Sequence, residues 1–127
     1  KMFFMKLLKI AATFIVLFLL STTSKAQMEI TAKQAAQHIG DSVRVCDIIL
    51  EGKYLYEAKD EPAQLFMGSR QPDPMFTIVI PKAVRMGFKY DPEKKLVNKR
   101  VCVIGRITKF EGRPAIFVSD ENEIKGM

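Results

Sequence analysis

The stretch that decides the fold is NKRVCVIGRITKFEGRPAIFVSD, residues 98–120. Apolar side chains recur at every second position of its first half, at Val101, Val103 and Ile107, which is typical of a half-buried strand over residues 98–110. A Glu-Gly-Arg turn follows, and residues 114–119 supply another apolar strand. The stretch therefore predicts a β-hairpin near the end of a β-rich domain.

Three further strands are predicted upstream, over residues 42–52, 64–68 and 75–80. In the first of them the apolar parity changes between Val45 and Ile48, which predicts a β-bulge near Cys46-Asp47. The polar residues 53–62 predict a loop between the first two strands.

Two short helices complete the pattern. Thr31 can cap a helix over residues 32–39, with an apolar stripe of alanines and Ile39, and a second helix over residues 82–88 follows Pro81. An all-β chain with five strands and a helix between the third and fourth is typical of the OB-fold, a five-stranded Greek-key barrel. Another small β-barrel or sandwich is the alternative.

Residues 1–26 have the order of a secretory signal peptide. Lysines precede the apolar run from Ile10 to Leu20, and Ser24-Lys25-Ala26 forms a small-x-small cleavage site. The alternative, a membrane anchor, is disfavoured because eleven helical residues span about 16 Å, against roughly 30 Å of hydrocarbon. We expect cleavage near Ala26, a single domain over residues 27–127, and a periplasmic or extracellular location.

The leader also accounts for most of the net charge. The full chain carries 20 basic and 14 acidic residues, but residues 1–26 hold four lysines and no acid, which leaves 27–127 at +2. Residues 82–113 carry ten basic and three acidic residues, a net +7, between two acidic segments. This segment indicates an anionic partner, unless its lysines only form a solvated surface.

The chain also resembles the small exported OB-fold proteins of bacteria, the nucleic-acid-binding (tRNA-anticodon-binding-like) OB-fold family. Residues 35–49, 65–80 and 98–120 carry the resemblance, in the expected order. Two positions depart from the family pattern: this chain has Asp47 where the pattern has Gly, and Phe66 where the pattern has Asn. The resemblance implies the fold, and it implies nucleic acid as a ligand only weakly, because OB-folds also bind sugars and proteins.

The two cysteines allow a specific prediction. Cys46 and Cys102 fall on the first and fourth strands, which are neighbours in an OB-fold, and both have the opposite parity to their flanking valines. An oxidising compartment favours a disulfide between them. The alternative is a pair of isolated buried thiols. With two cysteines and His38 as the single histidine, we expect no metal and no cofactor.

Catalysis has no support in the sequence, which contains no nucleophile elbow, P-loop or metal motif. Binding of single-stranded DNA or RNA needs basic and exposed aromatic side chains together. Phe76 and Phe117 are expected in the core. The alternative to nucleic acid is an envelope interaction or stress module that binds a protein, an oligosaccharide or a small cationic ligand. The candidate binding residues are Lys53, Tyr54, Tyr56, Arg70, Lys109, Phe110 and Arg113.

Overall fold

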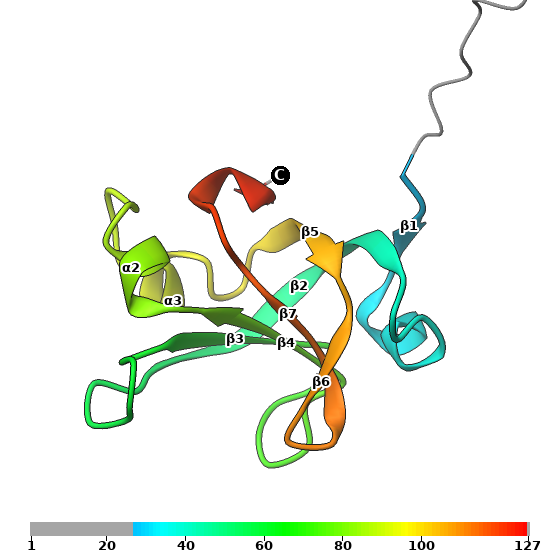
Figure 1. The fold of residues 1–127 in the computed structure, drawn as a ribbon, viewed down its shortest axis with the longest axis horizontal. Coiled ribbons are helices and arrows are strands. Elements are labelled where there is room, and N and C mark those ends of the chain that lie inside the picture. Colours follow the sequence, from blue (N-terminus) through cyan, green and yellow to red (C-terminus); the bar gives the residue numbers. More distant parts are fainter. Residues whose placement is uncertain (1–26, 127) are drawn as a thin grey trace, which may run out of the picture.

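The computed structural model describes residues 27–126 (Figure 1). The predicted signal peptide lies outside the described residues. The strands are β1 (Glu29–Ile30), β2 (Ser42–Tyr54), β3 (Ala63–Met67), β4 (Phe76–Ile80), β5 (Arg100–Arg106), β6 (Thr108–Phe110), β7 (Arg113–Phe117) and β8 (Ile124–Gly126). The helices are η1 (Ala32–Gln37), α2 (Lys82–Arg85), α3 (Pro92–Lys95) and η2 (Glu121–Glu123).

All strands of this part of the chain join in one eight-stranded sheet, in the order β6-β7-β4-β3-β2-β5-β8, with β1 paired to β2. The pairs are antiparallel except β1–β2 and β4–β7. The predicted count of five strands is corrected to eight, and strand pairing does not close the sheet into a barrel. The all-β class and an OB-like arrangement stand.

The decisive stretch forms two strands instead of one over residues 98–110. The strand is interrupted at Ile107. The backbone N–H of Ile107 donates to Asp41 O (3.0 Å), and its carbonyl accepts from Gly40 N (2.8 Å). As a result, β5 pairs with β2 and β6 pairs with β7. Gly105 permits Ile116 to pack closely on β5, because a Cβ there would lie 2.7 Å from Ile116 Cγ2.

The β-bulge was predicted at the wrong place. Cys46 and Asp47 pair in regular register with Cys102 and Val101, and the register shifts only between Ile49 and Glu51. The apparent change of parity misled because Ile48 is 46% exposed while Ile49 is fully buried. β2 therefore keeps one face toward the core as far as Ile49.

The disulfide prediction is confirmed. Cys46 and Cys102 are direct cross-strand neighbours, with 4.1 Å between their Cα atoms, and they are bonded to each other. Both are buried, on the face of the sheet opposite the valines of the core. The bridge joins β2 to β5 across 56 positions of sequence.

The first helix is a 3-10 helix that ends at Gln37 instead of Ile39. A 3-10 helix has three residues per turn, so only Ala32 and Ala35 share its buried face, and Ile39 is left 40% exposed. Asp47, where the resembled family has Gly, accepts a hydrogen bond from the Ala32 N–H (3.1 Å). This carboxylate ties the helix to β2.

The second predicted helix, over residues 82–88, ends at Arg85 as α2. α3 was not predicted, although Asp91-Pro92-Glu93 is a recognisable helix start. α3 packs tightly on β2, because a Cβ at Gly52 would lie 2.0 Å from Glu93 O. Gly52 thus lets α3 bring Glu93 against the sheet.

The hydrophobic core of the described part is formed by side chains that range in sequence from Ile30 to Ile124. It includes Phe76, as predicted. The described residues supply this core from side chains along their whole length, and we expect residues 27–127 to fold after cleavage of residues 1–26. Among residues 27–126, no helix has the length and apolar character needed to cross a membrane.

Candidate functional site

The face of the sheet that points away from the core provides the candidate site. In an OB-like fold this is the ligand-binding face. Residues paired directly across strands share a face, so the pairings define two rows across the sheet. The first row is Lys53, Gln64, Val79 and Phe117, and the second is Glu51, Phe66, Thr77 and Ala115. We call this surface the outer face.

Phe117 is the most exposed aromatic side chain of the outer face. It was predicted in the core, but it is 46% exposed, whereas its neighbours Ile116 and Val118 are buried. Its ring packs edge-on against the half-buried ring of Phe110, with 5.5 Å between centroids. The alternation of Ile116, Phe117 and Val118 was the signal that places Phe117 on the outer face. This pair offers an apolar surface on which a planar ligand can stack.

The loop of residues 68–75 covers the middle of the outer face. Phe66, where the resembled family has Asn, is 2% exposed beneath it. The space under the loop measures about 40 Å³, enough for a few waters and too small for a nucleobase. Gln64 and Val79, in the middle of the first row, are buried as well, so a ligand can reach this row at its two ends, Phe117 and Lys53.

Three polar contacts hold this loop down. Asp73 Oδ1 accepts a hydrogen bond from Arg113 Nε at 2.8 Å, in an ion pair with its carboxylate largely exposed. Arg70 Nε donates to Leu50 O at 3.4 Å, and the Gln71 N–H donates to a Glu51 carboxylate oxygen at 3.3 Å. Two predicted binding cations, Arg70 and Arg113, thus have partners inside the protein.

The other two predicted binding cations, Lys53 and Lys109, are exposed and have no carboxylate partner among the described residues. Lys53 is exposed at the end of the Phe117 row, and Lys109 is exposed on β6 beside the turn to β7. Neither makes an ion pair with the described residues. The structure therefore brings Phe110 and Arg113 together beside the loop, whereas Arg70 contacts the backbone of β2 and Lys109 lies on the other face of the β6–β7 hairpin.

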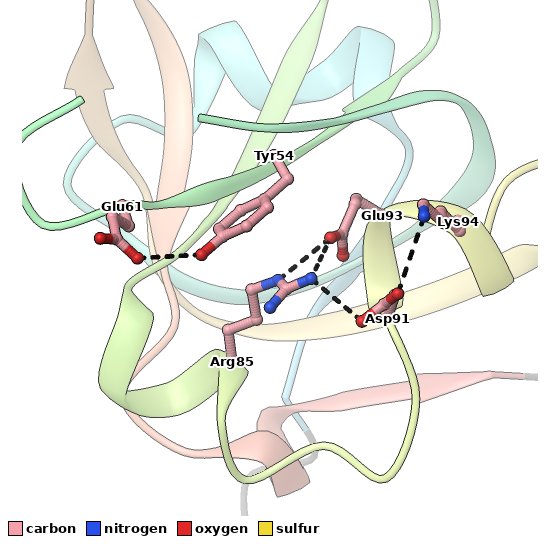
Figure 2. Close-up of polar contacts among 6 residues, drawn as sticks. All are labelled: Tyr54, Glu61, Arg85, Asp91, Glu93 and Lys94. Atoms are coloured by element: carbon pink, nitrogen blue, oxygen red, sulfur yellow. Dashed lines mark hydrogen bonds and ion pairs between the residues drawn. The ribbon is translucent and has the colours of Figure 1, made fainter. Parts of the chain in front are cut away.

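Tyr54 lies in a different environment, a polar cluster between β2, α2 and α3 (Figure 2). The Arg85 guanidinium lies over the Tyr54 ring, 3.8 Å from its centroid, and the phenol donates to Glu61 at 3.0 Å. Arg85 also binds Asp91 at 3.0 Å and Glu93, whose side chain is almost completely buried. We call Tyr54, Glu61, Arg85, Asp91 and Glu93 the closed cluster, because its aromatic and charged groups contact one another; Glu93 Oε2 is buried without a hydrogen-bond partner among the described residues.

The ionisation of the closed cluster follows from these contacts. The hydrogen bond from the Tyr54 phenol to Glu61 raises the pKa of Tyr54 above its ordinary value. Contacts with Lys82 and with that phenol lower the pKa of Glu61. The hydrogen bond to Glu93 raises the pKa of Arg85. Each shift favours the protonation state that the cluster uses at neutral pH.

Tyr56 lies at the rim of the closed cluster, with its ring centroid 6.3 Å from that of Tyr54. It is 66% exposed and lines an open hollow of about 440 Å³, formed by residues 53–58. Tyr56 is therefore available to a ligand, whereas the ring face of Tyr54 under Arg85 is not.

One group of three potential metal ligands occurs among the described residues, formed by Glu29, Cys46 and Cys102. The two sulfur atoms are bonded to each other, so neither is a thiolate that could bind a metal.

Comparisons with known proteins address the fold. The chain matches no protein-family model and no curated protein. It is similar to a crystal structure assigned as an aspartyl-tRNA synthetase from Leishmania major Friedlin, with a TM-score of 0.53 and 13% identity. The match covers 84% of this chain and 22% of the synthetase chain, so this chain spans about a fifth of that protein. At this identity the similarity supports an OB-like fold and no more.

Proposed function

We propose that residues 27–127 form an exported, non-catalytic binding protein whose outer face binds single-stranded nucleic acid. The exposed Phe117–Phe110 pair carries the proposal, because base stacking on aromatic rings is the sequence-tolerant part of single-strand recognition. Lys109 pairs with Pro114 on the opposite face of the β6–β7 hairpin. Arg113 pairs with Phe110 on the outer face, and Lys53 lies in the row of Phe117, three strand spacings or about 14 Å away. Arg113 and Lys53 supply contacts for phosphates.

The fold supports the same proposal. OB-folds use this face, together with the loop between their last two strands, to bind oligonucleotides. Here that loop is the β6–β7 turn beside Lys109, Phe110 and Arg113. The structurally similar synthetase acts, by its name, on a tRNA. This likeness alone identifies no ligand, since fold does not determine function.

The test is a fluorescence-anisotropy titration of residues 27–127 with single-stranded DNA and RNA at low and high salt. We expect binding that weakens as salt rises, because phosphate neutralisation releases counterions. Replacing Lys53 and Arg113 by Ala should remove two phosphate contacts and reduce the slope of log K against log salt by about 1.4. The matched control replaces the exposed Lys33 and Lys125 and should leave the slope unchanged. Absence of binding at low salt would overturn the proposal.

The alternative ligand is an oligosaccharide, and one observation favours it. Tyr56 borders the open hollow of residues 53–58, where an exposed tyrosine can stack against a sugar ring. In that case Tyr56→Ala abolishes oligosaccharide binding, whereas Phe117→Ala does not. The same titration with neutral oligosaccharides, whose binding should be insensitive to salt, separates the two ligand classes.

Export is tested separately, by mass spectrometry of the protein recovered from cells that express the full chain. We expect a mature N-terminus at Gln27 and recovery outside the cytoplasm. An intact residue 1–26 segment in the recovered protein would contradict the export proposal and leave the binding proposal unaffected.

A further inference from the structure

The connection between α2 and α3, residues 86–91, rises away from the sheet in Figure 1, and we consider it together with α3 as the segment 86–95. Its most exposed apolar side chain is Met86, at 73%, and Tyr90 is 42% exposed. The same segment contains three exposed lysines, Lys89, Lys94 and Lys95. This connection belongs to the +7 segment of the sequence and contributes nothing to the outer face or its proposed ligand.

The lysines of this segment make few ion pairs with acidic side chains of the described residues. Lys89 and Lys95 make no ion pair with the described residues, and Lys94 has a 3.9 Å contact with Asp91, whose carboxylate also binds Arg85. The other nearby carboxylate is that of Glu121, which lies beside Gly87. The segment thus has three lysines against two carboxylates, Asp91 and Glu93, both of which bind Arg85, and it also exposes Met86.

We propose that this connection docks on the surface of an anionic phospholipid membrane. Lysines near an anionic bilayer each contribute about fivefold to binding, and tyrosine prefers the interface between headgroups and acyl chains. Met86, a flexible apolar side chain at the start of the connection, can enter the acyl boundary while the lysines remain among the headgroups. The proposal does not depend on nucleic-acid binding at the outer face.

Single-stranded nucleic acid is a poorer fit for this surface. The Tyr90 ring packs edge-on against Phe88, with 5.7 Å between centroids, and the Lys95 ammonium lies 5.9 Å from the Tyr90 centroid. Both contacts compete with a stacked base. The arginine of this region, Arg85, is engaged by Glu93 and Asp91, which leaves no guanidinium free for a bidentate phosphate contact.

Co-flotation of residues 27–127 with vesicles tests the proposal. We expect binding to vesicles of equal parts phosphatidylcholine and phosphatidylglycerol, and no binding to pure phosphatidylcholine. Replacing Lys89, Lys94 and Lys95 by Gln should weaken binding about a hundredfold, from about fivefold per lysine. The control triple variant, Lys33, Lys59 and Lys125 to Gln, changes the net charge equally at other exposed positions. Equal losses in the two triple variants would overturn the proposal, since binding would then reflect net charge alone.

A second measurement tests the insertion of residue 86. The chain contains no tryptophan, so Met86→Trp introduces a single fluorescent reporter. We expect its emission to shift to shorter wavelength with anionic vesicles, while Ile39→Trp, at an exposed position after η1, remains unchanged. No shift at position 86 would overturn the proposal. Loss of single-stranded DNA binding in the lysine triple variant, with vesicle binding unchanged, would instead assign the connection to nucleic acid.

Discussion

Two regions of this domain combine an aromatic ring with an arginine, and they differ in what else surrounds that pair. In the closed cluster the Tyr54 ring is covered by Arg85, and Asp91, Glu93 and Glu61 neutralise the charges (Figure 2). On the outer face Phe117 is 46% exposed, and Arg113 has one largely exposed carboxylate, that of Asp73, as its partner. Residue types are therefore a poor guide to a binding site, because carboxylates elsewhere in the chain decide which region remains open.

The largest expected effect comes from the disulfide, which lies in neither region. Replacing both Cys46 and Cys102 by Ala should lower the free energy of unfolding by about 4 kcal/mol, because the bridge closes a loop of 56 positions. Urea denaturation checks this value. Ligand binding by the double variant, measured below the unfolding transition, should be unchanged. Thiol titration of the denatured, unreduced wild-type protein should find no free thiol. A loss below about 1 kcal/mol would show that the bridge contributes little.

Glu93→Gln should separate the two regions. It leaves the partly buried Arg85 without its nearest counter-charge, so we expect the free energy of unfolding to fall by about 3 kcal/mol. Affinity for nucleic acid should change less than about twofold, because the closed cluster provides no ligand contact. A variant that keeps its stability but loses binding would assign the closed cluster to the site.

Asp73→Asn should have a smaller effect, of the opposite sign for binding. It removes the partner of Arg113 and loosens the loop over the outer face, which should tighten nucleic-acid binding about two- to fivefold. Asp60→Asn, an equal charge change at an exposed position, is the control. Weaker binding after Asp73→Asn would indicate that the loop itself contacts the ligand.

The smallest effect concerns pH. The pKa of Glu61 lies below its ordinary value of 4.5, so its contribution to stability is present above that pH and disappears as the pH falls through the lowered pKa. The pKa of Tyr54 lies above its ordinary value of 10.0, so its contribution is complete below that pH and is lost as the pH rises through the raised pKa. Thermal melts from acid to alkaline pH, with Glu61→Gln as the comparison, should show the acid decrease weakened in the variant.

The sequence predicted the five longest strand segments and the core position of Phe76, because the alternation of apolar side chains is local in sequence. The pairing of the cysteines was predicted from the expected neighbouring strands of an OB-fold and an oxidising compartment. It missed β1 and β8, which contain few apolar residues and form through pairing with β2 and β5. It also missed the break at Ile107, which is caused by hydrogen bonds to the distant residues 40–41. The candidate site residues were predicted from their residue types. The position of Arg85 over the Tyr54 ring arises from tertiary contacts, which residue types do not reveal.

The most direct test of the account compares two aromatic side chains of similar exposure, Phe117 at 46% and Tyr90 at 42%. The measurement is the dissociation constant for single-stranded DNA of Phe117→Ala and Tyr90→Ala in residues 27–127. Stacking on an aromatic ring is worth about 1–3 kcal/mol per base, so Phe117→Ala should weaken binding about 5- to 150-fold, and Tyr90→Ala should remain within about twofold. Equal affinities for wild type and Phe117→Ala, or equal losses in both variants, would contradict the assignment of the outer face as the binding surface.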